Sequence, residues 1–110
     1  MGLKNWLDAL CHAPSIAELS RQLAQRSYAL VRDSVGPQVF AFSRAEARGY
    51  VRAKAAPVIR SEARALAGRY PGLSVASLGI AVSQASDRVV QSVLTDLNRE
   101  RTRQMLGRAA

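Results

Sequence analysis

The chain has 110 residues, of which sixteen are Lys or Arg and eight are Asp or Glu, so its formal net charge is +8 at pH 7. This length suits a single domain with a modest hydrophobic core, and the positive charge favours anionic partners: nucleic acid, an acidic protein or an anionic membrane surface. One cysteine excludes an internal disulfide, and the lack of CxxC pairs and glycine-rich phosphate loops gives no sign of a metal, a cofactor or a small-molecule substrate.

The first predicted element is a short amphipathic helix over residues 3–12, which Pro14 ends. We expect this helix to anchor on the body of the protein. Its apolar stripe consists of Leu3, Trp6, Leu7 and Leu10.

The second helix opens with Ser15 and Glu18 in the spacing of a capping box and runs towards Val35, where Gly36-Pro37 stops it. A helix-turn-helix is an alternative for this segment, but Ala24 stands where the turn glycine would be. One continuous amphipathic helix is therefore favoured. Its expected buried residues are Ile16, Leu19, Leu23, Leu30 and Val31.

After a short apolar link over residues 38–42, the third helix begins at a second capping box, Ser43 with Glu46, and continues to Tyr70. Proline inside a helix removes a backbone hydrogen bond and clashes with the preceding turn. In a straight helix, the first arginines would also share the face that later becomes apolar. We therefore predict a kink or an interruption near Pro57.

This third helix holds most of the positive charge. Its candidate site residues, expected to contact nucleic-acid phosphates, are Arg44, Arg48, Arg52, Arg60 and Arg64. None of them has an acid three or four residues away, and several form like-charge pairs four residues apart, which are destabilising. A solvated basic face without a ligand is the competing interpretation. Glu62 projects among apolar residues and is expected to form an interhelical salt bridge at the rim of the core.

The last helix follows Pro71-Gly72 and is capped by Ser74. Its apolar stripe has spacings of three or four: Val75, Leu78, Val82, Ala85, Val89, Val93 and Leu97. The small residues Gly79, Ala81 and Ala85 would let another helix approach closely. Residues 98–110 are expected to project as a basic end, with Asp96–Arg99 and Glu100–Arg103 pairs.

Together these elements predict one all-α domain over residues 1–110, an irregular antiparallel helical bundle of a short N-terminal helix and three longer helices. No apolar run approaches the roughly 20 residues of a membrane span, and the lone cysteine suits a reducing compartment, so we expect a cytoplasmic protein. No pair of titratable groups suggests acid–base catalysis, so we expect no enzyme. The leading hypothesis is nucleic-acid binding without base specificity. The alternative is a helical interaction module or homo-oligomer.

Overall fold

The computed structural model describes residues 14–109, with side chains described through Gly107. It contains three α-helices, α2 (Ile16–Ser34), α3 (Arg44–Arg69) and α4 (Val75–Ala109), and one 3-10 turn, η1 (Pro37–Ala41). The described part of the chain has no strand. The predicted all-α bundle is confirmed for these helices. The predicted helix over residues 3–12 lies outside the described residues.

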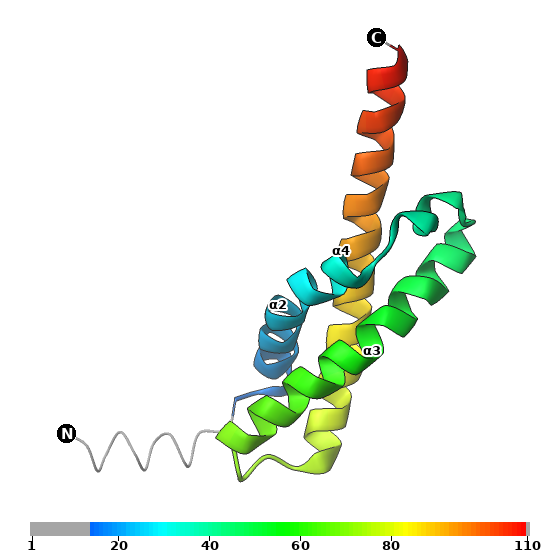
Figure 1. Cartoon of the computed structure of the whole chain (residues 1–110). Coiled ribbons are helices and arrows are strands. Elements are labelled where there is room, and N and C mark those ends of the chain that lie inside the picture. The colour runs from blue at the N-terminus through cyan, green and yellow to red at the C-terminus, as the bar shows by residue number, and fades with distance from the viewer. Residues whose placement is uncertain (1–13, 110) are drawn as a thin grey trace, which may run out of the picture.

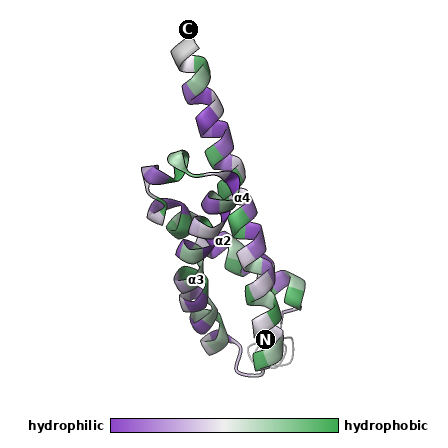
Figure 2. Cartoon of the chain, turned by 90° about the vertical axis from the view of Figure 1, so that its right-hand side faces the viewer, coloured by the Kyte–Doolittle hydropathy of each residue, from purple (hydrophilic) through white to green (hydrophobic). Residues whose placement is uncertain are grey.

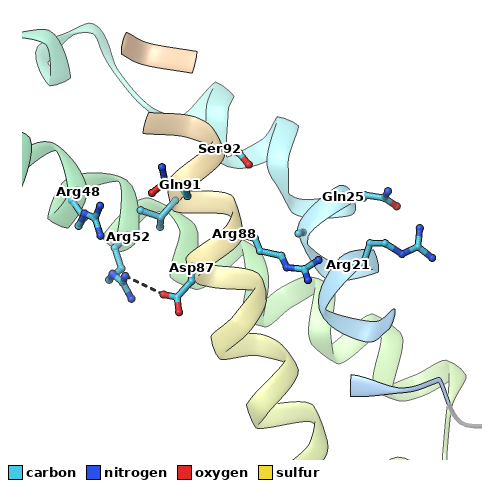
Figure 3. A pocket seen from close by; sticks show the side chains of 10 residues that line it. Arg21, Gln25, Arg48, Arg52, Asp87, Arg88, Gln91 and Ser92 are labelled. Atoms are coloured by element: carbon cyan, nitrogen blue, oxygen red, sulfur yellow. Dashed lines mark hydrogen bonds and ion pairs between the residues drawn. The ribbon is translucent and has the colours of Figure 1, made fainter. Parts of the chain in front are cut away.

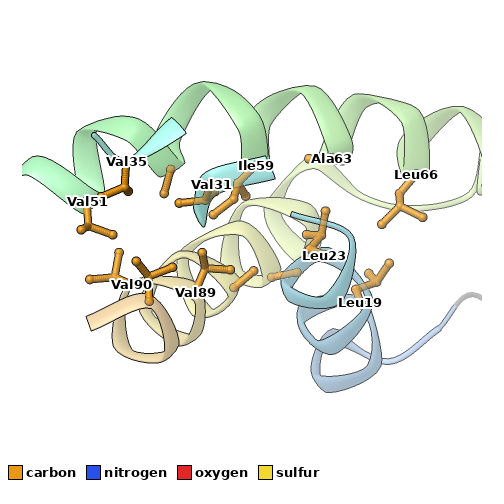
Figure 4. Close-up of a cluster of buried hydrophobic side chains, with 14 of the residues drawn as sticks. Leu19, Leu23, Val31, Val35, Val51, Ile59, Ala63, Leu66, Val89 and Val90 are labelled. Atoms are coloured by element: carbon orange, nitrogen blue, oxygen red, sulfur yellow. The ribbon is translucent and has the colours of Figure 1, made fainter. Parts of the chain in front are cut away.

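The helices run up, down and up. α3 is antiparallel to both α2 and α4, which therefore run in the same direction, and α2 and α4 share the most extensive contact (Figure 1). One hydrophobic core fills the space between the three helices (Figure 4). Short connections, η1 with its flanks and residues 70–74, suit helices that are neighbours in sequence and in space.

α2 is one continuous helix, as predicted, and the Ser15 hydroxyl accepts a hydrogen bond from the Glu18 amide at 3.2 Å. Its core residues repeat every four positions: Leu19, Leu23, Ser27 and Val31, with Ser20 beside them. The expected burial of Leu30 is wrong, since 51% of this residue is exposed. Leu30 precedes Val31 by one residue, which turns it about 100° away from the buried row.

The turn between α2 and α3 is held by Tyr50. Its hydroxyl accepts hydrogen bonds from the Gly36 backbone amide and the Gln38 side chain, both at 3.0 Å. The Tyr50 ring meets Phe42 edge to face at 5.4 Å between centroids. Val39 of η1 is buried in the core below them. This turn therefore fixes the start of α3 relative to the end of α2.

α3 begins at the predicted capping box, in which Ser43 and Glu46 exchange both hydrogen bonds. Its buried residues again step by four: Val51, Ala55, Ile59 and Ala63, followed by Leu66. A step of four advances 40° beyond a full turn, so the buried row winds round the helix as it proceeds. Its first part faces α4 near Val90, and its last part faces α2 near Leu19 (Figure 4).

The predicted interruption at Pro57 is wrong, because α3 continues unbroken through that residue. A helix that crosses its neighbours obliquely buries one face in its first half and a differently oriented face in its second half. Both apolar faces of α3 can therefore be buried without a break in the helix. Pro57 lies on the exposed side, where water can reach the backbone carbonyl that lacks a partner. A kink without interruption stays a prediction.

α4 is the longest element, and the Ser74 hydroxyl accepts from the Ser77 amide at its start. Its buried residues are Ala81, Ala85, Val89, Val90, Val93 and Leu97. The predicted stripe is thus confirmed from Ala85 to Leu97. It is wrong at Val75, which is 88% exposed in the first turn, before burial begins. Gly79 is exposed, and a Cβ there would meet no atom within 4 Å, so neither α2 nor α3 approaches it closely.

The C-terminal part of α4 extends past the other helices (Figure 1). Contacts with the body reach Arg101, whose guanidinium donates to the Phe40 carbonyl at 2.7 Å. Every residue from 101 to 107 is exposed. Hydrophilic residues dominate this end, with Met105 and Leu106 as exposed apolar side chains (Figure 2).

We predict that Pro57→Ala raises the free energy of unfolding by about 1–3 kcal/mol, because alanine restores the hydrogen bond to the Ala53 carbonyl inside a continuous helix. Urea denaturation followed by circular dichroism measures this change. Ser61→Ala, also exposed on α3, is the control and should change stability by about 0.5 kcal/mol or less. A less stable Pro57→Ala protein would show instead that the bundle requires a bend at the proline.

The capping box of α3 gives a pH-dependent prediction. The pKa of Glu46 is lowered from its ordinary value of 4.5, first by the hydrogen bond from the Ser43 backbone amide and then by that with its side chain. A lowered pKa in the folded state stabilises the protein above the ordinary value, and this is lost as pH falls through the lowered value. Wild type should therefore exceed Glu46→Gln in urea midpoint at pH 7, with the gap closing below pH 4.5. A gap that stays constant down to pH 3 would contradict this assignment.

Candidate functional site

All five arginines predicted to bind phosphate are exposed. They occupy the row of α3 that lies one residue beyond the buried row, so Arg52, Arg60 and Arg64 directly follow Val51, Ile59 and Ala63. Ala56 interrupts the row at its middle position. The packing of α3 therefore places these guanidinium groups at the margin of the core.

The arginine row has few anionic neighbours. Arg52 forms an ion pair with Asp87 of α4, with Nη2 and Oδ1 3.2 Å apart. Arg60 donates instead to the backbone carbonyl of Ala56 at 3.3 Å. Within residues 14–107, no carboxylate lies within 4.0 Å of Arg44, Arg48, Arg60 or Arg64; these four are unpaired in that part of the chain.

Two members of the row reach a groove that crosses the outer side of α4 (Figure 3). This open groove has a volume of about 740 Å³. Its arginines come from all three helices: Arg21 from α2, Arg48 and Arg52 from α3, and Arg88 from α4. Polar side chains complete the lining: Gln25, Asp87, Gln91 and Ser92. We call this surface the arginine groove; its lining contains four arginines and one carboxylate, that of Asp87.

The other predicted arginines lie elsewhere. Arg44 borders a small hollow with Phe40, Phe42 and Arg101, where α3 begins beside α4. Arg60 and Arg64 do not line the arginine groove. The structure thus brings together two of the five predicted residues and adds two that sequence reasoning missed.

The missed residues, Arg21 and Arg88, had one usable signal. Arg88 directly precedes Val89 of the apolar stripe, and Arg21 lies between Leu19 and Leu23, so both border the buried side of their helices. Their proximity to Arg48 depends on how the helices pack.

Three further acids of the described residues form ion pairs away from the groove. The Glu62 carboxylate accepts from Arg26 of α2 at 2.9 Å, which confirms the predicted interhelical bridge at the rim of the core. Glu100 pairs with Arg32 of α2, and the expected Glu100–Arg103 pair is therefore wrong. Long-range packing overrides the local i, i+3 spacing here, since α2 lies beside α4 at this level. The expected Asp96–Arg99 pair is present at 3.9 Å.

The arginine side chains of the groove suit the recognition of anions. Guanidinium groups donate up to five hydrogen bonds in a planar fork that matches phosphate oxygens, and they hold their charge at all physiological pH values.

Within the described residues, no group of three His, Cys, Asp or Glu side chains is arranged to hold a metal ion. Over residues 14–109, no helix has both the length and the apolar character needed to cross a membrane.

Scans of protein-family models, of curated proteins and of solved structures find no match to this chain.

The groove's one ion pair gives a prediction about stability. The Arg52 and Asp87 side chains are 53% and 65% exposed, and exposed pairs contribute about 0–1 kcal/mol. Asp87→Asn should therefore change the free energy of unfolding in urea by less than about 1 kcal/mol. A larger loss would mean that Asp87 holds α3 against α4.

Proposed function

We propose that this protein is a non-enzymatic nucleic-acid-binding protein that holds the sugar–phosphate backbone in its arginine groove, without base specificity. The observation that carries the proposal is the gathering of four arginines from three separate helices around one groove with a single carboxylate. Such a surface has a positive potential that attracts a polyanion and raises its association rate.

The electrostatic repulsion among the groove arginines supports the proposal that the groove binds an anionic ligand. Arg48 and Arg52 already repel each other as neighbours four residues apart on α3, and packing adds Arg21 and Arg88 to the same groove. A bound phosphate chain would relieve this repulsion with charge-assisted hydrogen bonds. Glu62 and Glu100 cannot do so, because they already pair with α2.

The uncharged lining fits the same ligand. Gln25, Gln91 and Ser92 offer hydrogen-bond donors beside the guanidinium groups. Phosphate and sugar contacts in nucleic-acid complexes come from arginine together with serine and glutamine side chains, and they carry no sequence information. This composition supports backbone binding.

A second candidate is a helical interaction module or homo-oligomer. Large apolar side chains are exposed at both ends of α4: Val75 and Ile80 near its start, and Met105 and Leu106 on its projecting end. Sedimentation equilibrium at several salt concentrations tests this candidate. A salt-insensitive dimer supports it, whereas a monomer at high concentration contradicts self-association.

The nucleic-acid proposal predicts a strong dependence on salt. If four phosphates are neutralised, log K against log salt should have a slope of about −3 on a single strand and about −3.6 on a duplex. The double variant Arg48→Gln/Arg88→Gln should make the slope shallower by about 1.4 to 1.8 and weaken binding at low salt by at least about tenfold. Filter binding at several salt concentrations measures both quantities.

Two further variants distinguish binding in the groove from a general effect of the protein's net charge on binding. Arg64→Gln/Arg69→Gln removes the same charge from exposed positions that do not line the groove, so it should weaken binding much less. Asp87→Asn removes the groove's carboxylate and should strengthen binding. Equal losses in both double variants would contradict a role for the groove, and no binding of either nucleic acid at low salt would dismiss the proposed function.

A further inference from the structure

The arginine groove continues into three further hollows, the first two between α2 and α4 and the last along α4 alone. The next hollow, of about 350 Å³, shares Gln25, Arg88 and Ser92 with the groove and adds Tyr28. A third hollow, of about 440 Å³, contains Tyr28 again and reaches Arg99. A fourth, of about 470 Å³, lies on the surface of α4 alone, from Thr95 to Arg103. We call this series the seam.

Tyr28 occupies a distinctive position on the seam. It borders the second and third hollows, so it lies between the arginine groove and Arg99. The residue is partly buried and packs against the core, which anchors the side chain, while it also lines the two hollows. Among the residues that line the groove and these three hollows, it is the only aromatic one.

The order of side chains along the seam is cationic, aromatic and cationic. Six arginines line it, against the two aspartates Asp87 and Asp96. Proteins that hold single strands combine a positive groove that follows the backbone with aromatic rings on which bases stack. A duplex keeps its bases stacked inside the helix, so its bases would not reach a ring placed between two phosphate-binding groups.

We propose that the ligand of this surface is single-stranded nucleic acid, with phosphates on the seam arginines and a base stacked on Tyr28. This inference rests on the proposed function and narrows it to one class of ligand. From Arg88 to Arg103 the seam follows sixteen residues of α4, whose fifteen steps of 1.5 Å span about 22 Å of helix. A stacked strand rises about 3.4 Å per nucleotide, so about six or seven nucleotides would cover this length.

The proposal predicts that wild type binds a single-stranded oligonucleotide of about ten nucleotides more tightly than the same sequence as a duplex, by tenfold or more. Tyr28→Ala should weaken single-strand binding by about five- to 150-fold, because one base–aromatic stack is lost. Tyr28→Phe keeps the ring and should stay within about twofold of wild type. Fluorescence anisotropy at fixed low salt measures all of these affinities.

A direct readout uses an oligonucleotide that carries the fluorescent base 2-aminopurine. Stacking on Tyr28 should quench its emission in wild type and in Tyr28→Phe. Because Tyr28 also packs against the core, Tyr28→Leu is the control for folding, since leucine keeps apolar contact without an aromatic face. It should retain the fold, judged by circular dichroism, and lose both the quenching and the extra affinity.

The outcomes separate this inference from the proposed function. Equal affinity for single strand and duplex, with Tyr28→Leu unchanged, would overturn the inference and leave backbone binding in place. Failure to bind either nucleic acid at low salt would overturn both.

Discussion

The three helices meet along rows of side chains that repeat every four residues, and the rest of the molecule depends on this geometry. On α3 the row from Val51 to Ala63 is buried, so the next row, which carries Arg48 and Arg52, must lie at the margin of the core. Because such a row winds round its helix, α3 crosses its neighbours obliquely, and the margin meets the outer side of α4. The position of the arginine groove is therefore a consequence of how the core packs.

The shortage of carboxylates decides which arginines are available. The chain has half as many acids as bases, and several acids have structural roles. Glu46 caps α3, while Glu62 and Glu100 tie α3 and α4 to α2. Only Asp87 remains for the groove. Two of the acids thus hold helices together, and positive charge accumulates where α2, α3 and α4 line the groove.

Local patterns predicted the helices well, because caps and apolar spacing act within a few residues. Ser43 with Glu46 marked the start of α3, and the position of Glu62 among apolar residues indicated its bridge. The errors arose where a neighbouring helix decides the outcome. Leu30 and Val75 fit an apolar stripe, but none of the described helices covers them. The groove depends on the packing that brings Arg21 and Arg88 to the same surface as Arg48.

The free end of α4 has a consequence for the dynamics of the chain. Residues 101–107 are all exposed, and short helices without packing are marginal in water, so the helicity of this end depends on propagation from the packed segment that ends near Arg101. A gradient of local stability should therefore run along one continuous rod, with amide protons near Gly107 exchanging far faster than those near Val93. A partner that binds this end of α4 would lose conformational entropy by ordering only a few helical turns, because the packed part of α4 is already rigid.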